Sequence, residues 1–413
     1  MIFIYRILIN LIFFLSPIII LIRLIKKKEN IKRFREKLCF FSEKKLKGKV
    51  IWFHGASVGE LQSIVPLIEK IGKDNTVKQI LITSNTLSSS KVIQKLKIKK
   101  VTHQFFPVDT NFLSKKFLDY WKPSSAFFID SEIWPNMIFN LKKRNIPINL
   151  INGRITKKTF KRWKKVSKFS KSIFSKLDLC LSSSLESKKY LKKLGAQKVK
   201  FIGNLKFSQS EKKNIKVNSD FKKFIFSKRI WCASSTHENE EQFCGSVHKE
   251  LNKKYKNLLT VIIPRHVERA DIIKNTLENM DLKVHLHEPR KKIDEDTNIY
   301  IVNAYGQTKS FYDICKNVFL GGSLVNRGGQ NPLEAARYGC NILHGPNVMN
   351  FKEIYEFLKK NNISIKVSKK REMFNHLSKL FMRKKPSRKI KNRLNLIGRK
   401  ILDTTYKEVK FTY

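Results

Sequence analysis

The sequence predicts an α/β fold with two doubly wound domains, each built on a parallel sheet, and three observations support this. Short apolar runs alternate with longer polar segments that suit helices, a pattern typical of βαβ units. The length of 413 residues suits two domains of ordinary size. The alternation also restarts after a charged stretch at 208–224 that has no strong apolar period, so this stretch is the expected linker.

The strands are expected in two sets, one for each domain. The first set is Val50–His54, Gln79–Thr83, Ala126–Ile129 and Ile148–Ile151. The second set is Ile230–Ala233, Leu258–Ile263, Ile299–Val302, Asn317–Leu320 and Asn341–His344. The basic segment from Lys366 to Tyr413 follows the last strand and is expected to form one or two helices.

The N-terminus differs from the rest of the chain because the sixteen residues Ile7–Ile22 carry no charge. A membrane helix needs about 20 apolar residues, and Arg6 and Arg23 can extend along the span to reach the interface. No small-residue cleavage pattern follows, so a retained anchor is favoured over a signal peptide. The positive-inside rule then puts the chain from Lys26 onward in the cytoplasm. A helix lying in the interface is the alternative, since polar residues and a proline interrupt the span.

The anchor and the two strand sets together divide the chain into five expected parts. These are a membrane anchor at 1–25, an N-terminal domain at 26–207, a linker at 208–224, a C-terminal domain at 225–390 and a basic tail at 391–413. No internal sequence repeat is expected, although both domains have the same alternation of strands and helices.

The charge of the chain limits its possible partners. Lysine and arginine number 85 against 33 acidic residues, which gives a formal net charge of +52. Such a balance suggests nucleic-acid binding, because phosphate neutralisation dominates that interaction. The basic residues are nevertheless spread through every segment, and neither an RNP pattern nor a zinc-finger spacing occurs, so no nucleic acid partner is predicted. The charge suits an anionic membrane surface or a phosphorylated substrate instead. A membrane-tethered protein that binds nucleic acid or anionic lipid through its charge is the alternative from another class.

The six cysteines form no CxxC pair and no cluster with neighbouring histidines. They are therefore predicted to be buried thiols in a reducing compartment, and no metal site is predicted.

The stretch Gly321–Glu334 is the most informative motif, because two glycine pairs precede a helix-start signal. Glycines permit close backbone approach, Asn331 can cap, Pro332 suits the first helical position, and Glu334 stands where a capping-box carboxylate belongs. Such a helix start presents N–H groups to an anion. The Walker and GxGxxG spacings are both missing from this stretch. The motif therefore predicts a phosphate or nucleotide site, with a plain capped turn as the alternative.

Further motifs follow expected strands, where open α/β sheets bind ligands. Ser57 and Glu60 have capping-box spacing, so Glu60 is either tied to its own helix or, if partly desolvated, a general base toward a sugar hydroxyl. Ser235 and Glu238 have the same spacing beside hydroxyls that could hold phosphate or carboxylate. Arg265 follows the strand at 258–263, where its guanidinium can pair with phosphate or lie flat on a base.

Together these segments resemble the 3-deoxy-D-manno-octulosonic acid (Kdo) transferases, which attach Kdo to the lipid A precursor in Gram-negative bacteria. The resemblance covers most of the chain, and the segments occur in the family's order and spacing. They are FHGASVGE, FFPVD, DSEIWPN, INGRITKKT, GNLKF, ASSTHENEE, IIPRH, GGSLVNRGGQNPLEAA and GPNVMNF.

The resemblance implies a GT-B architecture, with two Rossmann-like domains facing a cleft, the acceptor on the N-terminal side and CMP-Kdo on the C-terminal side. It implies that Glu60 takes a proton from the acceptor hydroxyl as that oxygen attacks the anomeric carbon of Kdo and CMP departs. The reaction is expected to invert the anomeric centre and to need neither metal nor cofactor. The implied partners are the CMP-Kdo donor, the lipid A precursor lipid IVA and inner-membrane lipids. The anchor is expected in the inner membrane, with the catalytic domains on its cytoplasmic side.

The resemblance also implies which residues line the site. The donor pocket is expected to contain Ser234, Ser235, Thr236, Arg265, Gly322, Ser323, Asn331 and Glu334, and the acceptor side or cleft Ser57, Glu132 and Lys206. Gln330 stands where the family usually has histidine, so this position can form hydrogen bonds but cannot become positively charged. A GT-B enzyme that uses another nucleotide sugar is the alternative within the class.

Overall fold

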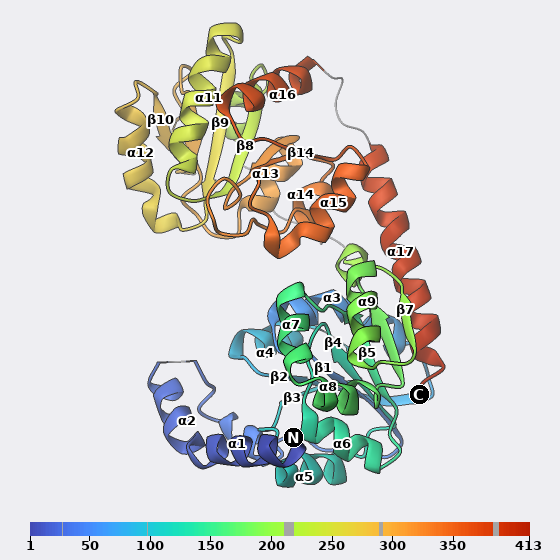
Figure 1. Cartoon of the computed structure of the whole chain (residues 1–413). Helices are drawn as coiled ribbons and strands as arrows, with labels where there is room; N and C mark the ends of the chain where they lie inside the picture. Colours follow the sequence, from blue (N-terminus) through green and yellow to red (C-terminus); the bar gives the residue numbers. More distant parts are fainter. Residues whose placement is uncertain (27, 97, 210–218, 289–291, 383–387) are drawn as a thin grey trace. The chain divides into compact units, whose positions relative to one another are not determined.

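The computed structural model describes residues 1–26, 28–96, 98–209, 219–288, 292–382 and 388–413 (Figure 1). The chain folds into two compact units, Met1–Ser210 with Ile397–Tyr413, and Glu211–Leu396. Most of the expected linker at 208–224 lies at 210–218, outside the described residues. Its last part forms the short helix α10 (Ser219–Phe224).

The N-terminal unit begins with two helices, α1 (Ile2–Phe14) and α2 (Ser16–Ile25), whose axes are bent by 49°. Pro17 lies in the first turn of α2, where the missing N–H costs no helical hydrogen bond. Among the described residues no single helix is long and apolar enough to cross a membrane, whereas the bent pair together meets that test by length and composition.

The sheet of the N-terminal unit has seven parallel strands in the order β3-β2-β1-β4-β5-β6-β7. They are β1 (Lys49–His54), β2 (Val77–Ser84), β3 (Val101–Phe105), β4 (Ser125–Ile129), β5 (Ile148–Gly153), β6 (Leu179–Ser182) and β7 (Val199–Phe201). The central strands β1 and β4 contain continuous apolar runs, Val50–Phe53 and Ala126–Ile129, because helices cover both faces. The strand order reverses between β1 and β4, and open sheets of this kind bind ligands at that point.

Five helices of this unit begin at hydroxyl side chains that accept backbone N–H groups, namely α3 (Val58–Gly72), α4 (Leu87–Gln94), α5 (Asn111–Trp121), α7 (Lys157–Lys165) and α9 (Leu185–Leu194). Thr86, Thr110, Thr156 and Ser184 cap their helices in this way. The unit also contains α6 (Pro135–Lys143), α8 (Ser167–Phe174) and the 3-10 turns η1 (Phe34–Leu38) and η2 (Leu205–Ser208). The core between them contains large buried aromatic side chains, including Trp52 and Trp121.

The C-terminal unit has a second sheet of seven parallel strands, in the order β10-β11-β9-β8-β12-β13-β14. The strands are β8 (Arg229–Thr236), β9 (Leu258–Pro264), β10 (Val284–Leu286), β11 (Ile299–Ile301), β12 (Asn317–Leu320), β13 (Asn341–His344) and β14 (Ser364–Lys366). The helical segments are α11 (Glu240–Lys254), η3 (Val267–Arg269), α12 (Ala270–Glu278), α13 (Thr308–Ile314), α14 (Leu333–Arg337), η4 (Met349–Phe351), α15 (Lys352–Lys360) and α16 (Lys370–Met382). Here the strand order reverses between β8 and β12.

The predicted α/β class with two doubly wound sheets is confirmed, and every strand predicted from the sequence is present. Five strands were not predicted, namely β3, β6, β7, β10 and β14. Three of them are only three residues long, so they make no apolar run that stands out from a loop. The six cysteines are all buried and unpaired, as predicted.

The C-terminal segment forms two helices, α16 and α17 (Arg388–Lys410), and Lys366 itself ends β14. The boundary between the two units lies between Leu396 and Ile397, within α17. The sequence had predicted that a separate basic tail begins at residue 391. The C-terminal part of α17 packs closely against the N-terminal unit, because a Cβ on Gly398 would lie 2.3 Å from the carbonyl oxygen of Phe207. Glycine therefore lets α17 approach the backbone of η2.

Candidate active site

Glu60 lies in the first turn of α3, directly after β1. Its carboxylate accepts hydrogen bonds from the N–H of Ala56 at 2.7 Å, the N–H of Ser57 at 3.3 Å and the hydroxyl of Ser57 at 2.9 Å. Ser57 Oγ in turn accepts the N–H of Glu60, so the predicted capping box is confirmed. Oε2 receives two N–H groups and Oε1 one hydroxyl, which leaves Oε1 one further acceptor position.

Two more carboxylates lie near Glu60, both following β4. Burial and, to a smaller extent, the negative charges of Glu132 and Asp130 raise the pKa of Glu60 to about 7, against the opposing effect of hydrogen bonds from Ser57 and Ala56. A carboxyl group that titrates near neutrality can both accept and release a proton at physiological pH. The site therefore holds a base of suitable strength at the point where the strand order reverses.

Asp130 has a left-handed backbone, with φ of 56°, and its side chain is buried. Burial raises its pKa, and the charges of Lys206 and Arg154 and a hydrogen bond from Asn152 oppose this. Asn152 links Asp130 to the turn η2. Its side-chain N–H donates to Asp130, and its side-chain carbonyl oxygen accepts the N–H of Leu205 at 2.9 Å. Lys206 is the next residue, so the sheet brings it close to the acidic cluster.

A chain of hydrogen bonds leads from the core to Glu132. His54 Nε2 lies 3.3 Å from Glu132 Oε2, and His54 Nδ1 lies 2.9 Å from Thr83 Oγ1. Trp52 donates its indole N–H to the same Thr83 oxygen. Burial lowers the pKa of His54, so the ring is neutral. A carboxylate only accepts, so the single ring proton lies on Nε2, and Nδ1 accepts the hydroxyl proton of Thr83.

In the C-terminal unit, the glycine turn after β12 encloses the carboxylate of Glu240. The backbone N–H groups of Gly322, Ser323 and Leu324 donate to it at 2.6, 3.1 and 2.9 Å. Glu240 is the first residue of α11 and is buried. A Cβ on Gly321 would lie 2.5 Å from the carbonyl oxygen of Ser235, so only glycine fits there. An internal carboxylate thus occupies the N–H groups of the glycine turn, whereas the sequence pointed to the N–H groups of the following helix start for an external anion.

The predicted hydroxyl cluster at the end of β8 is mostly engaged within the protein. Ser234 is fully buried, with its hydroxyl 2.8 Å from that of Tyr312. Ser323 is also fully buried, and its hydroxyl donates to Leu320 O and accepts the N–H of Gly345. Thr236 differs, because its buried Oγ1 has no hydrogen-bond partner among the described residues.

The expected capping box of Ser235 and Glu238 is wrong. Ser235 and Asn239 both have positive φ, of 56° and 71°, so the chain turns twice before α11 begins at Glu240. Asn239 provides no side-chain cap. Glu240, and not Glu238, accepts a backbone N–H at this helix start, that of His237 at 3.0 Å.

The remaining predicted donor residues lie on β9 and α14. Arg265 is exposed immediately after β9, and no acidic side chain in the described part of the chain pairs with its guanidinium. The predicted cap at Asn331 is wrong, because Pro332 is the N-cap of α14 and no side chain caps this five-residue helix. Asn331 Oδ1 instead accepts the N–H of Leu333 at 3.1 Å. Glu334 does not complete a capping box, because its carboxylate pairs with Lys309 at 3.3 Å.

The structure therefore assembles the predicted residues into two groups, one in each unit. Ser57, Glu60, Glu132 and Lys206 gather at the ends of β1 and β4, and the donor residues gather around β8, β9, β12 and α14. The sequence missed His54, Thr83, Asp130, Tyr312 and Glu240 as members of these groups. His54 and Asp130 each follow or end an apolar strand, a position that could have marked them. No local signal marks the bonds of Glu240 to the glycine turn, because those partners lie more than eighty residues away.

Comparison with known proteins agrees with this arrangement. A family model described as 3-deoxy-D-manno-octulosonic-acid transferase (kdotransferase) matches residues 32–209. The 3-deoxy-D-manno-octulosonic acid transferase of Rickettsia bellii is 31% identical over 92% of this chain and 91% of its own length. The enzyme of that name from Aquifex aeolicus is 28% identical over 84% of this chain and 90% of its own length.

A solved structure of a putative UDP-N-acetylglucosamine 2-epimerase from Listeria monocytogenes has the same fold, with a TM-score of 0.58, 12% identity and coverage of 89% of this chain and 98% of that one. At that identity the likeness concerns architecture alone. With 31% identity over nine tenths of both sequences, the chain belongs to the 3-deoxy-D-manno-octulosonic acid transferase family.

Proposed function

We propose that the protein transfers Kdo from CMP-Kdo to lipid IVA, with inversion at the anomeric carbon and with Glu60 as the general base. Membership of the Kdo transferase family supports the reaction class. The observation that carries the mechanism is the Glu60 carboxylate, which its own helix start holds in place while one acceptor position of Oε1 stays open.

The chemistry follows from that geometry. The acceptor hydroxyl donates its hydrogen bond to Oε1 of Glu60, and its oxygen attacks the anomeric carbon of Kdo. As the new carbon–oxygen bond forms, the bond from that carbon to the phosphate oxygen breaks, and CMP leaves with the electron pair. Glu60 takes the hydroxyl proton, and with a pKa of about 7 it can return that proton to water after each turnover. The neighbouring charges of Glu132 and Asp130 increase its affinity for the proton.

The donor is proposed to bind in the C-terminal unit, at the reversal of strand order between β8 and β12. Arg265 is suited to the CMP phosphate, because its exposed guanidinium has no acidic partner among the described residues. Thr236, at the end of β8, has a fully buried hydroxyl without a hydrogen-bond partner among the described residues. Glu334 is proposed to accept the ribose hydroxyls, sharing its carboxylate with Lys309.

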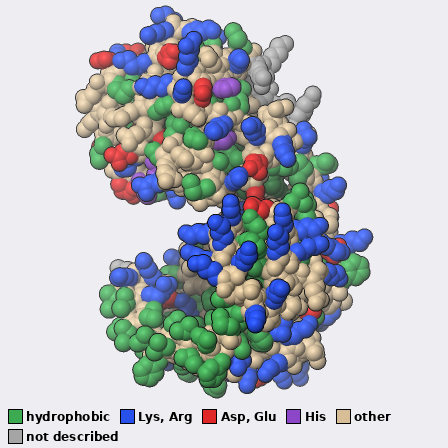
Figure 2. All heavy atoms as spheres, viewed as in Figure 1, with side chains coloured by type: hydrophobic (Ala, Val, Ile, Leu, Met, Phe, Trp, Pro, Cys, Tyr) green, Lys and Arg blue, Asp and Glu red, His purple; other side chains and the backbone are tan. Residues whose placement is uncertain are grey.

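We also propose that α1 and α2 bind the inner membrane, with both units on its cytoplasmic side. Figure 2 shows hydrophobic side chains covering the outer surface of these helices. The exposed ones are Met1, Phe3, Ile4, Ile7, Leu8, Leu11, Ile12, Phe14, Leu15, Ile18, Ile19, Leu21, Ile22 and Ile25. On its other side α1 is held to the unit, since Tyr5 donates to Asp109 at 2.8 Å and Arg6 to Asn136 at 3.0 Å. A helix bound along its length in this way favours insertion into one leaflet.

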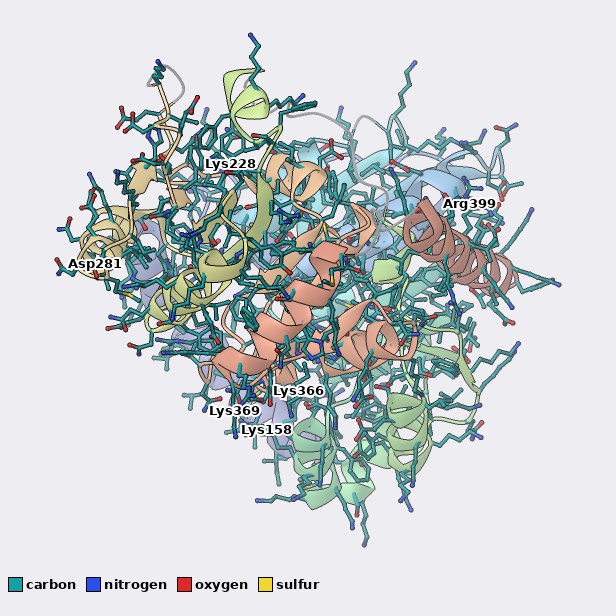
Figure 3. All side chains as sticks on the ribbon, turned by 90° about the horizontal axis from the view of Figure 1, so that it is seen from above. Lys158, Lys228, Asp281, Lys366, Lys369 and Arg399 are labelled. Carbon is teal, nitrogen blue, oxygen red and sulfur yellow. The ribbon has the colours of Figure 1, made fainter. Side chains whose placement is uncertain are left out.

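The basic charge is proposed to support this membrane contact rather than nucleic-acid binding. Basic side chains project from many separate elements, as Lys158 on α7, Lys228 before β8 and Arg399 on α17 illustrate (Figure 3).

The test is a transfer assay with the full chain in detergent, a CMP-Kdo generating system and tetraacyl disaccharide bisphosphate, followed by mass spectrometry of the lipid. Wild type and the matched control Glu69→Gln, an exposed position on the same helix, should add one or more Kdo units. Glu60→Gln keeps the capping geometry and should lose about 100-fold or more in rate. Equal rates in all three proteins would leave Glu60 as a helix cap only. A folded protein that binds CMP but leaves the lipid mass unchanged would reject the donor or the acceptor.

A further inference from the structure

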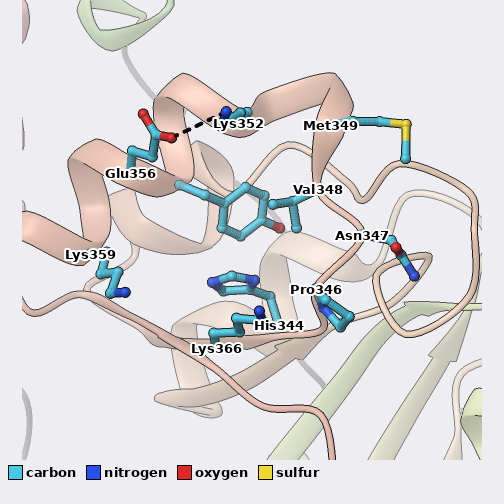
Figure 4. Close-up of a pocket in the computed structure, with 10 residues that line it drawn as sticks. His344, Pro346, Asn347, Val348, Met349, Lys352, Glu356, Lys359 and Lys366 are labelled. Carbon is cyan, nitrogen blue, oxygen red and sulfur yellow. Dashed lines mark ion pairs between the residues drawn. The ribbon is translucent and has the colours of Figure 1, made fainter.

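A pocket that the proposed reaction does not use opens at the carboxyl ends of β13 and β14, within the C-terminal unit (Figure 4). Its volume is about 290 Å³. His344 and Tyr355 lie on its inner side, with ring centroids 4.3 Å apart. Val348 and Met349 add an apolar wall from the loop that follows β13. The pocket therefore combines two aromatic rings, tilted by 49° to each other, with an apolar edge.

The charged groups around this pocket are mainly positive. Lys352, Lys359 and Lys366 line it, and Glu356 is the acidic residue beside them, 3.8 Å from Lys352. Lys359 and Lys366 have no acidic partner among the residues that the structure describes. Three ammonium groups and one carboxylate leave two positive charges uncompensated around the opening.

The positive charges of Lys359 and Lys366 affect the pKa of His344, which lies inside the pocket. Burial lowers its pKa, and the charges of Lys366 and Lys359 lower it further, while a hydrogen bond to Gly345 O opposes the shift. A carbonyl oxygen only accepts, so Nδ1 carries the ring proton and donates to Gly345 O at 2.7 Å. Nε2 is therefore an acceptor and suits a ligand hydroxyl.

The pocket is tied firmly to the glycine turn. The hydroxyl of Tyr355 donates to the carbonyl oxygen of Gln330 at 3.0 Å. Asn347 donates its backbone N–H to Ser323 O and its side-chain amide to Leu324 O. These bonds keep the aromatic surface and the apolar loop in place whether or not a ligand is present.

We propose that this pocket is a binding site for a phosphorylated sugar, with the phosphomonoester between Lys359 and Lys366, a sugar hydroxyl on His344 Nε2 and the sugar ring against Tyr355. A phosphomonoester carries nearly two negative charges at pH 7 and so matches the two uncompensated positive charges, whereas a carboxylate supplies only one. The binding itself is independent of Kdo transfer. The phosphate comes either from the glycolipid acceptor, in which case the role rests on the proposed function, or from a soluble sugar phosphate.

The first experiment measures binding of inorganic phosphate and of glucosamine 1-phosphate to the full chain by calorimetry, in detergent and with saturating CMP. The double variant Lys359→Gln/Lys366→Gln should bind both probes at least tenfold more weakly than wild type. The matched control Lys369→Gln/Lys370→Gln changes the same charge on exposed residues outside the pocket and should bind like wild type. Acetate at equal ionic strength should not compete. Equal phosphate affinity in all three proteins would overturn the proposal.

A second experiment separates the two sources of the phosphate. If the acceptor supplies it, the pocket variant should raise the KM for the bisphosphorylated acceptor about tenfold with kcat unchanged, and inorganic phosphate should compete with the acceptor. If a soluble sugar phosphate is the ligand, the variant should lose binding in the first experiment but keep its KM. Absence of Kdo transfer in the wild type would reject the proposed function and leave the calorimetric result to decide on the pocket.

Discussion

The imidazole of His54 and the carboxylate of Glu132 lie 3.3 Å apart, at the ends of neighbouring parallel strands. Because the ring is neutral and donates through Nε2, it orients the Glu132 carboxylate without cancelling its charge. That charge is one of those that raise the pKa of Glu60. A buried histidine thus contributes to the strength of a base that it does not touch.

The pH dependence of the reaction should follow Glu60. Its pKa is raised to about 7, and the base must be deprotonated to act, so kcat/KM should be constant at higher pH and fall about tenfold per pH unit below 7. Initial rates between pH 5.5 and 9 measure this. A profile that stays flat down to pH 5.5 would mean that another group accepts the proton.

Removal of the negative charge of Glu132 should shift the pH profile of kcat/KM. In Glu132→Gln the amide oxygen can still accept from His54 and Trp134, but the negative charge beside Glu60 is gone. The pKa of Glu60 should fall, so the acid limb of kcat/KM should shift to lower pH. The control Glu69→Gln should leave the limb where it is. An unshifted limb in Glu132→Gln would show that its charge does not act on Glu60.

Loss of the carboxylate inside the glycine turn should destabilise the protein. Glu240→Ala leaves buried N–H groups of Gly322 and Ser323 without partners, and we expect a loss of about 3 kcal/mol or more in the free energy of unfolding. The exposed neighbouring variant Glu238→Ala should change it by less than about 0.5 kcal/mol. Urea denaturation measures both. Similar midpoints for the two variants would contradict a structural role for Glu240.

Two glycine substitutions should act in opposite directions. A Cβ on Gly321 would lie 2.5 Å from Ser235 O, so Gly321→Ala should lower the melting temperature. Gly59 lies within α3 with nothing within 4 Å of the added atom, so Gly59→Ala should stabilise by up to about 1 kcal/mol. Thermal unfolding compares them, and a Gly321→Ala protein as stable as wild type would mean that the turn can relax.

Membrane binding should depend on the apolar surface of α1 and α2. The double variant Leu11→Asp/Ile18→Asp places charges where we propose that lipid chains lie, so flotation with anionic vesicles should decrease strongly. Phe226→Asp is the control, because Phe226 is 93% exposed but lies in the other unit. Equal flotation of both variants would reject α1 and α2 as the membrane contact.

What the sequence could predict about the site depended on distance along the chain. The capping box of Ser57 and Glu60 involves residues three positions apart, and the structure contains it. The same spacing at Ser235 and Glu238 was misleading, because Ser235, near the end of β8, and Asn239, just before α11, both have positive φ. The bonds of Glu240 to the glycine turn and of His54 to Glu132 join residues about eighty positions apart, which only the strand order brings together.

The fold itself was easier to predict than the site. Buried strands such as β1 and β4 each contain four consecutive apolar residues, so the sequence marks them clearly. A short strand such as β7 at the sheet edge is mostly exposed and carries no such mark. The order of the strands, which decides where the two groups of site residues assemble, depends on packing between distant segments and cannot be read from any single run.

The Glu240 carboxylate also affects how the turn responds to its surroundings. A loop of free backbone N–H groups would attract whatever anion the solution offers, and its shape would vary with salt. With its own carboxylate in place, the turn is already ordered before a substrate arrives. The substrate therefore binds a loop that is already ordered, so the binding free energy contains no cost for ordering it.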